Sequence, residues 1–341
     1  MCQRICVALS FALEPDLLIA DEITSALDRK SQDELIQLLI TIKNTLKTGI
    51  LFITHDLRLA RQIADRILFL KQCRFEEITL HNEENSCKAV PRCRDKARRC
   101  STLLDLAITS KYYDSKLILK DLSFQINTGE IFGILGESGC GKSTLARLLS
   151  GIEGSYTGEI SFNGQRLAEK QKSAGRYFYK DIQIIFQNER ACLNPYEKII
   201  SIVEAAIKNL RRDCQTPREL AKRSLAAVGL DESLYMRRSG NLSTGQCQRV
   251  SIARAIAVEP QLMILDEVVS ALDVSSKRGI LELLAELQAK LDIAMLMISH
   301  EIDVLQTLCQ RVALMRNGTV EEIIDVDDRS LDKMKKFLME S

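Results

Sequence analysis

A glycine-rich segment near the middle of the chain restricts the possible folds more than any other feature. It runs from Gly136 to Thr144 and fits the pattern G-x-x-x-x-G-K-[ST]. A strand-like apolar run (residues 131–135) leads into this segment, and a helix-like run (residues 144–149) follows it. The glycines allow successive backbone N–H groups to point at phosphate oxygens, and the N-terminus of the helix adds its positive dipole end. The sequence therefore predicts an α/β fold that binds a nucleotide, ATP or GTP, through its phosphates.

We call this segment the phosphate loop. Lys142 is expected to reach the β- and γ-phosphates, and the Ser143 hydroxyl is expected to bind Mg²⁺. The alternative is a glycine-rich turn with a chance Lys-Ser pair, which the flanking strand and helix disfavour. The residues expected to surround the phosphates are Gly136, Glu137, Ser138, Gly139, Cys140, Gly141, Lys142, Ser143 and Thr144.

Composition limits the class of protein. A chain of 341 residues is long enough for two domains of about 150 residues each. The net charge of +1 gives no electrostatic reason to expect nucleic acid as a partner. No apolar run reaches the ~18 residues of a membrane span, and no secretory signal opens the chain. We therefore expect a reducing, cytoplasmic environment in which the 11 cysteines are thiols or metal ligands rather than disulfides.

The chain contains an internal repeat. Shifting the sequence by 245 positions aligns residues 1–77 with residues 246–322 without a gap, and a chance match of this length and register is not credible. The matching groups are Gln3-Arg4 with Gln248-Arg249, Glu14-Pro15 with Glu259-Pro260, Asp21-Glu22 with Asp266-Glu267, residues 25–28 with residues 270–273, His55 with His300, and Glu76-Glu77 with Glu321-Glu322.

The first copy of the repeat has no phosphate loop. Met1 aligns with Gln246, and the phosphate loop of the second copy begins 110 residues before that position (246 − 136). The sequence thus predicts three parts: residues 1–77, the C-terminal part of a truncated first domain; residues 78–103, a connector; and residues 104–341, a complete domain. The apolar runs 17–20 and 50–53 suit buried parallel strands, and the truncation is expected to expose apolar strand edges.

The connector is polar and contains three cysteines. Cys87, Cys93 and Cys100 have the spacing C-x5-C-x6-C. They are either unrelated solvated thiols or ligands of a metal or iron–sulfur site, which thiolates suit. A full cluster usually takes four ligands, and the connector offers no fourth cysteine.

Polar side chains follow several strand-like runs of the second copy. Gln187 ends the run from Ile182, the pair Asp266-Glu267 ends the run from Leu262, and His300 ends the run from Ala294. Carboxylates just after a buried strand hold Mg²⁺ and orient water in phosphoryl-transfer enzymes. The alternatives are solvated strand ends and a core histidine. The repeat disfavours them, because it reproduces both carboxylates and the histidine at the same separation.

These motifs, in this order, resemble the nucleotide-binding domain of ATP-binding cassette (ABC) transporters. One further motif carries the resemblance, the signature segment, which we define as Leu242, Ser243, Thr244, Gly245 and Gln246. The resemblance covers residues 104–322, and residues 1–77 resemble the latter part of a second such domain. It implies an α/β fold with a mixed, mainly parallel sheet, helices on both faces and a helical subdomain.

A narrower resemblance is to the oligopeptide/dipeptide/nickel importer group. It rests on residues 186–188 followed by Leu193-Asn194-Pro195, and on the sequence of the phosphate loop, residues 136–144. The spacing of the connector cysteines is also similar, and their counterparts bind an iron–sulfur cluster in some members. It implies an ATPase subunit that energises import, first of di- or oligopeptides and alternatively of nickel or another small solute. Two other interpretations remain: a soluble ABC ATPase that acts on ribosomes or DNA, and an inactive truncated remnant.

The resemblance also implies roles for residues of this sequence. Tyr112, with Tyr113 as second choice, would stack on adenine. Ser143, Gln187 and Asp266 would hold Mg²⁺. Glu267 would act as general base, with His300 at the γ-phosphate and Asp273 also at the nucleotide.

The signature segment acts in trans in this family, on ATP held by an opposing domain. The implied partners are transmembrane permease subunits, a second nucleotide-binding domain from the same or another gene product, and indirectly a periplasmic or surface solute-binding protein. The implied location is peripheral, on the cytoplasmic side of the inner membrane. Thr244 departs from the usual glycine, Ile23 and Val268 depart from the usual proline, and the truncation leaves neither site complete within one chain.

Overall fold

The computed structural model divides the chain into two compact units, residues 1–88 (unit 1) and 89–341 (unit 2), which we describe separately. The structure describes residues 9–10, 15–21, 23–24, 29–46, 48–54, 57–71, 74–78, 101–168, 175, 178–187, 189–211, 213–270, 272, 274–327 and 329–339. Within these ranges, no helix combines the length and the apolar character that crossing a membrane requires.

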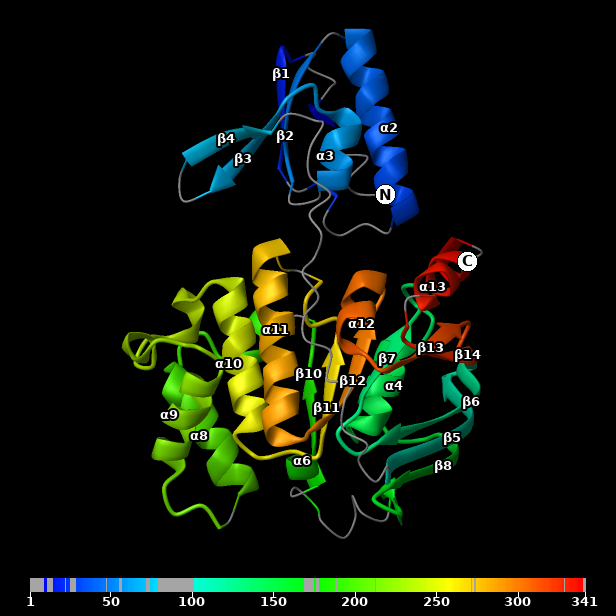
Figure 1. Cartoon of the computed structure of the whole chain (residues 1–341), viewed down its shortest axis with the longest axis vertical. Helices are drawn as coiled ribbons and strands as arrows, with labels where there is room; N and C mark the ends of the chain where they lie inside the picture. The colour runs from blue at the N-terminus through cyan, green and yellow to red at the C-terminus, as the bar shows by residue number, and fades with distance from the viewer. Residues whose placement is uncertain are drawn as a thin grey trace. The chain divides into compact units, whose positions relative to one another are not determined.

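A six-stranded sheet forms the centre of unit 2 (Figure 1). Its spatial order is β10-β11-β12-β7-β13-β14, in which the first five strands are parallel and β14 is antiparallel to β13. The strands are β7 (Ile131–Leu135), β10 (Ile182–Ile185), β11 (Leu262–Asp266), β12 (Ala294–Ser299), β13 (Arg311–Arg316) and β14 (Thr319–Asp325). Because the strands are parallel, the carboxyl ends of β7, β10, β11 and β12 lie at one edge of the sheet.

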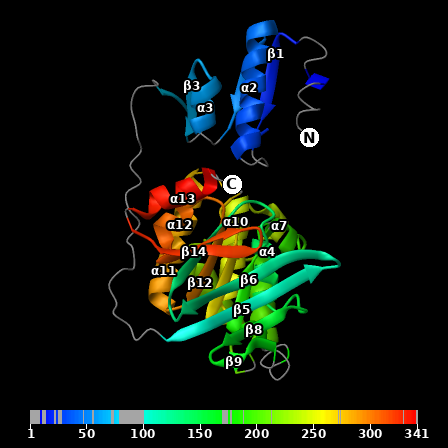
Figure 2. The same ribbon diagram turned by 90° about the vertical axis from the view of Figure 1, so that its right-hand side faces the viewer.

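A second, antiparallel sheet has the order β6-β5-β8-β9 (Figure 2). Its strands are β5 (Thr102–Tyr113), β6 (Lys116–Asn127), β8 (Thr157–Phe162) and β9 (Gln165–Arg166). The predicted Asn163-Gly164 turn joins β8 to β9, with both residues at positive φ (54° and 72°). Alternate residues of β5 and β6 point into a core that this layer shares with the central sheet and the helix after the phosphate loop.

Helices cover both faces of the central sheet. Helix α4 (Lys142–Leu149) packs into the core with the antiparallel layer, whereas α10 (Thr244–Ile256), α11 (Val274–Leu291) and α12 (Ile302–Leu308) pack on the opposite face. Every residue of β7, β11 and β12 is buried, as expected for parallel strands covered on both sides. The remaining helices are α6 (Phe178–Asp181), α7 (Glu189–Cys192), α8 (Ile199–Leu210), α9 (Pro217–Ala227), α13 (Ser330–Met339) and two 3₁₀ turns, Glu232–Leu234 and Ser239–Asn241.

Together, α8, α9 and α10 form the predicted helical subdomain. Helix α8 buries Ile199, Val203 and Ile207 on one face, with the spacing of an amphipathic helix. Helix α9 begins at Pro217, whose missing N–H is no loss at a helix start.

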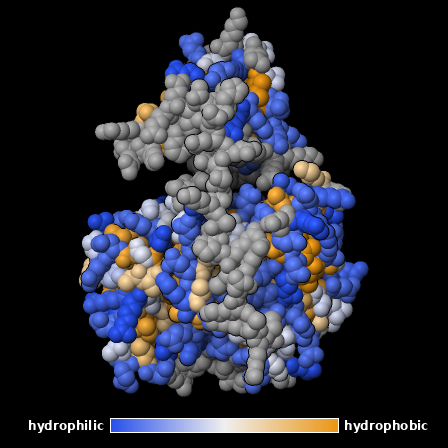
Figure 3. All heavy atoms as spheres, viewed as in Figure 1, coloured by the Kyte–Doolittle hydropathy of each residue, from blue (hydrophilic) through white to orange (hydrophobic). Residues whose placement is uncertain are grey.

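The α/β fold class predicted from the sequence is confirmed. The surface in Figure 3 is mainly hydrophilic, interspersed with apolar areas.

Unit 1 repeats the last elements of unit 2. Its elements are β1 (Leu17–Asp21), α2 (Arg29–Leu46), β2 (Gly49–Ile53), α3 (Leu57–Ile63), β3 (Ile67–Lys71) and β4 (Arg74–Ile78). Adding 245 places β1 on β11, α2 on α11 and α3 on α12, residue for residue. The pairing agrees as well, because β1 and β2 are parallel with Leu17 opposite Gly49, and β11 and β12 are parallel with Leu262 opposite Ala294.

The two units differ in burial. In unit 1, α2 and α3 cover one face of the β1–β2 pair through Leu35, Ile36, Leu39, Leu59 and Ile63. Alternate residues on the other face are exposed. The prediction of fully buried strands is therefore correct for one face only. A continuous apolar run does not show whether a second covering layer is present.

Candidate nucleotide-binding site

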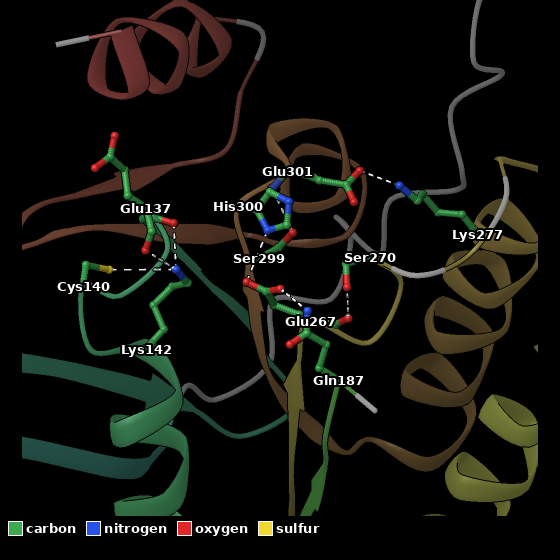
Figure 4. Close-up of polar contacts among 11 residues, drawn as sticks. Glu137, Cys140, Lys142, Gln187, Glu267, Ser270, Lys277, Ser299, His300 and Glu301 are labelled. Atoms are coloured by element: carbon green, nitrogen blue, oxygen red, sulfur yellow. Dashed lines mark hydrogen bonds and ion pairs between the residues drawn. The ribbon is translucent and has the colours of Figure 1, made fainter. Parts of the chain in front are cut away.

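Four polar motifs meet at the carboxyl edge of the central sheet of unit 2. The phosphate loop follows β7, Gln187 follows β10, Glu267 follows β11, and His300 follows β12. Figure 4 shows Gln187, Glu267 and His300 near these strand ends and Lys142 at the start of α4, all facing one region. The parallel sheet thus brings together residues that are more than 150 positions apart in sequence (300 − 142 = 158).

The phosphate loop has a backbone that glycine makes possible. Gly139 and Gly141 have φ of 84° and 106°, in the left-handed region that side chains disfavour. A Cβ on Gly136 would lie 2.4 Å from the carbonyl oxygen of Met315 in β13. These glycines therefore let the loop turn tightly against the sheet.

The ammonium of Lys142 lies inside the phosphate loop. Its Nζ donates to the carbonyl oxygens of Gly136 (2.8 Å) and Glu137 (2.6 Å) (Figure 4). The residue is only 5% exposed, and the Cys140 Sγ is 3.9 Å from the same Nζ. Burial raises the pKa of the Cys140 thiol, so the thiol stays protonated and does not neutralise the lysine. A buried cation held at the loop is suited to binding phosphate oxygens.

Asp266 and Ser143 form a pair suited to Mg²⁺. Asp266 is 5% exposed and accepts a hydrogen bond from the Ser143 side chain. Its Oδ1 is buried and has no hydrogen-bond partner within the described ranges. Burial raises the pKa of this carboxyl, and the hydrogen bond from Ser143 and the charges of Lys142 and Arg147 offset that rise only in part. A hard divalent cation with oxygen ligands fits this donor set.

Glu267 is held at both carboxylate oxygens. Its Oε1 lies 3.2 Å from His300 Nδ1, and its Oε2 accepts a hydrogen bond of 2.9 Å from Gln187 Nε2. The hydrogen bond with His300 lowers the pKa of Glu267 more than its burial raises it, and the charge of Lys142 lowers it further. The carboxylate is therefore ionised at neutral pH and fixed in direction, which suits a proton acceptor.

The backbone of Glu267 is strained. Its φ is +52°, which is unusual for a side chain with a Cβ, and its N–H donates to Ile298 at 3.0 Å. Both the N–H and the hydroxyl of Ser270 donate to the Glu267 carbonyl oxygen, at 3.2 and 2.9 Å. Sequence reasoning did not assign Ser270 this positioning role. The signal was present, because the repeat places Ser25 at the equivalent position.

The two tyrosines before the phosphate loop differ in their contacts. The Tyr113 hydroxyl donates to Glu153, and Lys111 Nζ lies 4.9 Å from the Tyr113 ring centroid. Tyr112 is 51% exposed and therefore offers ring surface for stacking. Stacking of Tyr112 on adenine, with Tyr113 as second choice, stays a prediction.

The signature segment lies at the start of α10, on the sheet face opposite α4. Ser243 caps the helix, since Gln246 N–H donates to its Oγ (3.3 Å) and Gln246 Oε1 accepts from its N–H (3.0 Å). Thr244 is exposed and Gly245 is half-buried at the same helix end. Arg190, which sequence reasoning missed, donates to the Leu242 carbonyl oxygen at 2.7 Å.

Two sets of predicted residues cannot be placed. Asp273 and the connector cysteines Cys87, Cys93 and Cys100 lie outside the described residues. Within the ranges that are described, no group of three or more His, Cys, Asp or Glu side chains is arranged to hold a metal ion. The iron–sulfur site therefore stays a prediction.

Comparison with known proteins identifies the family. The profile of the ABC transporter family matches residues 119–270. The nickel import ATP-binding protein NikE of Shigella boydii is 39% identical over 239 residues, which cover 67% of this chain and 89% of NikE. The chain belongs to the ABC transporter family of ATP-binding proteins.

A longer relative also matches unit 1. The ABC transporter ATP-binding protein YejF of Escherichia coli (strain K12) is 34% identical over 350 aligned residues, which cover 94% of this chain. The chain spans 65% of the length of YejF.

Solved structures with the same fold include CbiO1 of Clostridium perfringens, part of the ABC transporter complex CbiONQ. It superposes with a TM-score of 0.61 at 28% identity and covers 69% of this chain and 92% of CbiO1. The ATP-binding cassette MJ0796, solved as a dimer with ADP and phosphate in a post-hydrolysis state, gives a TM-score of 0.57 at 26% identity. It covers 66% of this chain and 99% of MJ0796.

Proposed function

We propose that unit 2 binds ATP with Mg²⁺ and hydrolyses it as the ATPase subunit of an ABC importer. The observation that carries the proposal is the grouping of Lys142, Asp266 and Glu267 at one edge of a parallel sheet, beside a phosphate loop. An isolated phosphate loop would support nucleotide binding only. A fixed, ionised carboxylate next to it supports hydrolysis.

In the proposed mechanism, Lys142 and the loop N–H groups bind the β- and γ-phosphates and neutralise their charge. Ser143, Asp266 and Gln187 would hold Mg²⁺, which supplies further positive charge to the phosphates. Glu267 accepts a proton from the attacking water. His300 contacts one carboxylate oxygen of Glu267 and Gln187 contacts the other, and His300 would also contact the γ-phosphate.

The site further requires a signature segment from a second domain. The chain's own segment lies at the start of α10, and no hydrogen bond joins it to the phosphate loop within the described ranges. The N-terminus of α10, which begins within the signature segment, would meet the γ-phosphate of an opposing domain. The dimeric state of MJ0796 supports this arrangement. We propose that the partner is unit 2 of another chain or a separate ATPase subunit.

Unit 1, in this proposal, corresponds to the C-terminal part of an ABC domain (residues 1–77), followed by the connector 78–103 and the complete domain 104–341. The ungapped 245-residue correspondence of the helices and strands supports it. The Asp273 contact with nucleotide, and iron–sulfur binding by Cys87, Cys93 and Cys100, belong to the same proposal.

The proposed setting is the cytoplasmic face of the inner membrane, on permease subunits that receive solute from a binding protein. Di- or oligopeptides are the first candidate solute, by resemblance to that importer group. Nickel is the second, favoured by the 39% identity with NikE. Transport assays with each solute, in cells lacking and expressing the chain, would separate the two. Recovery with ribosomes instead of membranes would contradict the transport role.

Titration of the full chain with a fluorescent ATP analogue tests the nucleotide site. Lys142→Ala removes the buried cation from the loop. We expect it to weaken binding by about a hundredfold, since each hydrogen bond to a charged group contributes roughly 1.5–3 kcal/mol. Lys290→Ala is a matched control at the surface, and it should bind as the wild type does. Equal affinity of both variants would contradict the site.

A further inference from the structure

An ion pair joins the starts of two helices beside the candidate nucleotide-binding site. Lys277 Nζ lies 2.5 Å from Glu301 Oε2, and the two side chains are only 23% and 26% exposed (Figure 4). Lys277 is in the first turn of α11 and Glu301 directly precedes α12, so the pair connects two elements. By contrast, Lys290 pairs with Glu286 of the same helix, and both side chains are largely exposed. Partial shielding from water makes the Lys277–Glu301 pair, which we call the inter-helix pair, the stronger of the two.

His300 lies next to the inter-helix pair in the chain. Its side chain is 50% exposed, and within the described part of the chain its ring makes one hydrogen bond, with Glu267 Oε1 at 3.2 Å. A half-exposed ring of this kind takes its direction mainly from the backbone that carries it. The backbone on either side therefore decides whether His300 reaches Glu267.

That backbone is fixed at Glu301. The Glu301 N–H donates to Ser299 Oγ at 3.0 Å, and Ser299, the last residue of β12, is buried. Glu301 occupies the N-cap position of α12, but its side chain makes no capping hydrogen bond. The carboxylate reaches Lys277 instead. The chain that follows His300 is thus held from the side of α11.

The segment before α11 holds the other side of Glu267. Both the N–H and the hydroxyl of Ser270 donate to the Glu267 carbonyl oxygen. From Ser270 the chain leads into α11, whose first turn carries Lys277. Glu267 is therefore supported at its carbonyl by the segment that leads to α11, and at its carboxylate by the residue that leads to α12. The inter-helix pair fastens these two supports to each other.

Unit 1 provides an internal comparison, because its α2 and α3 correspond to α11 and α12 at a shift of 245. Gln32 stands at the position of Lys277, yet α2 and α3 still pack together through their apolar residues. The ion pair of Lys43 with Asp65 lies at the opposite end of α2. A lysine at the start of the first helix is therefore not needed for the two helices to pack, which favours a role in the site of unit 2.

We propose that Lys277 and Glu301 are positioning residues for ATP hydrolysis. Their ion pair holds the start of α12 against the start of α11 and so keeps His300 in contact with Glu267. Both residues act through His300 and not on the nucleotide. The inference rests on the proposed function of unit 2, since it assigns these residues a part in that reaction.

Single substitutions in the full chain test the ion pair. Lys277→Met removes the ammonium and keeps the length of the side chain, and Glu301→Leu removes the carboxylate. We expect each to lower kcat by about tenfold, because misplacement of a reacting group slows the chemical step. The affinity for the fluorescent ATP analogue should stay within about twofold of that of the wild type, since the phosphate loop is unchanged.

Lys290→Met is the matched control, because it breaks an ion pair that lies within α11. It should leave both kcat and the affinity for the analogue unchanged. Wild-type kcat in Lys277→Met or in Glu301→Leu would overturn the proposal. So would a loss of affinity as large as the loss of kcat, which a general loss of structure would cause.

Double variants separate positioning through His300 from a general structural role. His300→Ala should lower kcat, and adding Lys277→Met to it should lower kcat by less than about twofold more, because the positioned ring is already absent. Exchanging the charges, Lys277→Glu with Glu301→Lys, should raise kcat at least about threefold above that of Lys277→Glu alone. Independent effects of His300→Ala and Lys277→Met, or no recovery on exchange, would overturn the proposal.

Failure of this inference differs from failure of the proposed function. Normal turnover by Glu267→Gln, or a wild-type chain that releases no phosphate, would contradict the proposed function and overturn this inference with it. Independent effects in the double variants would overturn this inference alone. Hydrolysis and its dependence on Glu267 would then remain intact.

Discussion

Units 1 and 2 contain the same run of six elements, yet only unit 2 encloses its strands. In both, the first strand pairs in parallel with the second at the same register, and two helices cover one face. Unit 2 adds β7, α4 and the antiparallel layer on the other face. The comparison shows that the strand–helix–strand segment adopts its local structure from its own contacts. The nucleotide site and the second half of the core need the phosphate-loop half.

The largest expected effect concerns Glu267, the carboxylate that we propose as the general base of ATP hydrolysis in unit 2. Glu267→Gln keeps the shape and one acceptor oxygen for Gln187 or His300, but its amide cannot accept a proton. We expect phosphate release to fall by about 10²–10⁴-fold, the usual contribution of a general base. ATP affinity, measured by the fluorescent analogue, should stay near that of the wild type. Normal turnover by this variant would refute the role of Glu267 and leave unit 2 without an identified base.

A pair of equivalent substitutions tests the difference in burial directly. Ile264→Ala creates a cavity in a closed core and should destabilise unit 2 by about 2–5 kcal/mol. Ile19→Ala, at the same position of the repeat, lies on the exposed face of the β1–β2 pair and should change stability by less than about 0.5 kcal/mol. Urea unfolding followed by hydrogen exchange can report each unit separately. Equal losses in the two variants would show that the strands are enclosed to the same extent.

A smaller effect concerns the pH dependence of unit 2. A lowered pKa keeps Glu267 ionised, so hydrolysis is retained as the pH falls and is lost only below the ordinary glutamate value of about 4.3. His300→Ala removes the largest cause of the lowering and leaves the burial that raises the pKa. The acid limb of the kcat profile should therefore move to higher pH. If the rate falls and the acid limb of the kcat profile stays at the same pH, His300 contacts the γ-phosphate and does not set the pKa of Glu267.

Much of unit 2 could be predicted from the sequence, because its signals are local. Glycines mark the phosphate loop, and apolar runs that end in Gln187, Asp266-Glu267 and His300 mark parallel strands. A parallel sheet necessarily brings those ends together. The left-handed backbone of Glu267 and the role of Ser270 were not predicted, since they depend on contacts formed only after the strands have paired.

The exposed face of the β1–β2 pair in unit 1 could be predicted only in part. The runs 17–20 and 262–265 are both continuous and apolar, so periodicity gives them the same interpretation. Residues 1–77 contain no phosphate loop, so the layer that covers the second copy has no counterpart among them. Which residues this would expose depends on the pleat and on the side taken by α2 and α3. Those are properties of the folded chain.

In our proposal, unit 2 supplies the catalytic residues and receives the signature segment from a second chain. Mixing two inactive variants of the full chain tests it most directly. Lys142→Ala lacks a functional phosphate loop, and Ser243→Arg blocks the signature, so each alone should release almost no phosphate. In a mixed dimer, the intact loop of one chain faces the intact signature of the other. We expect mixing to restore about a quarter of the wild-type rate. Random pairing makes about half of the two-fold dimers mixed, and each mixed dimer has one intact site of its two. Full activity of Ser243→Arg alone, or no recovery in the mixture, would contradict it.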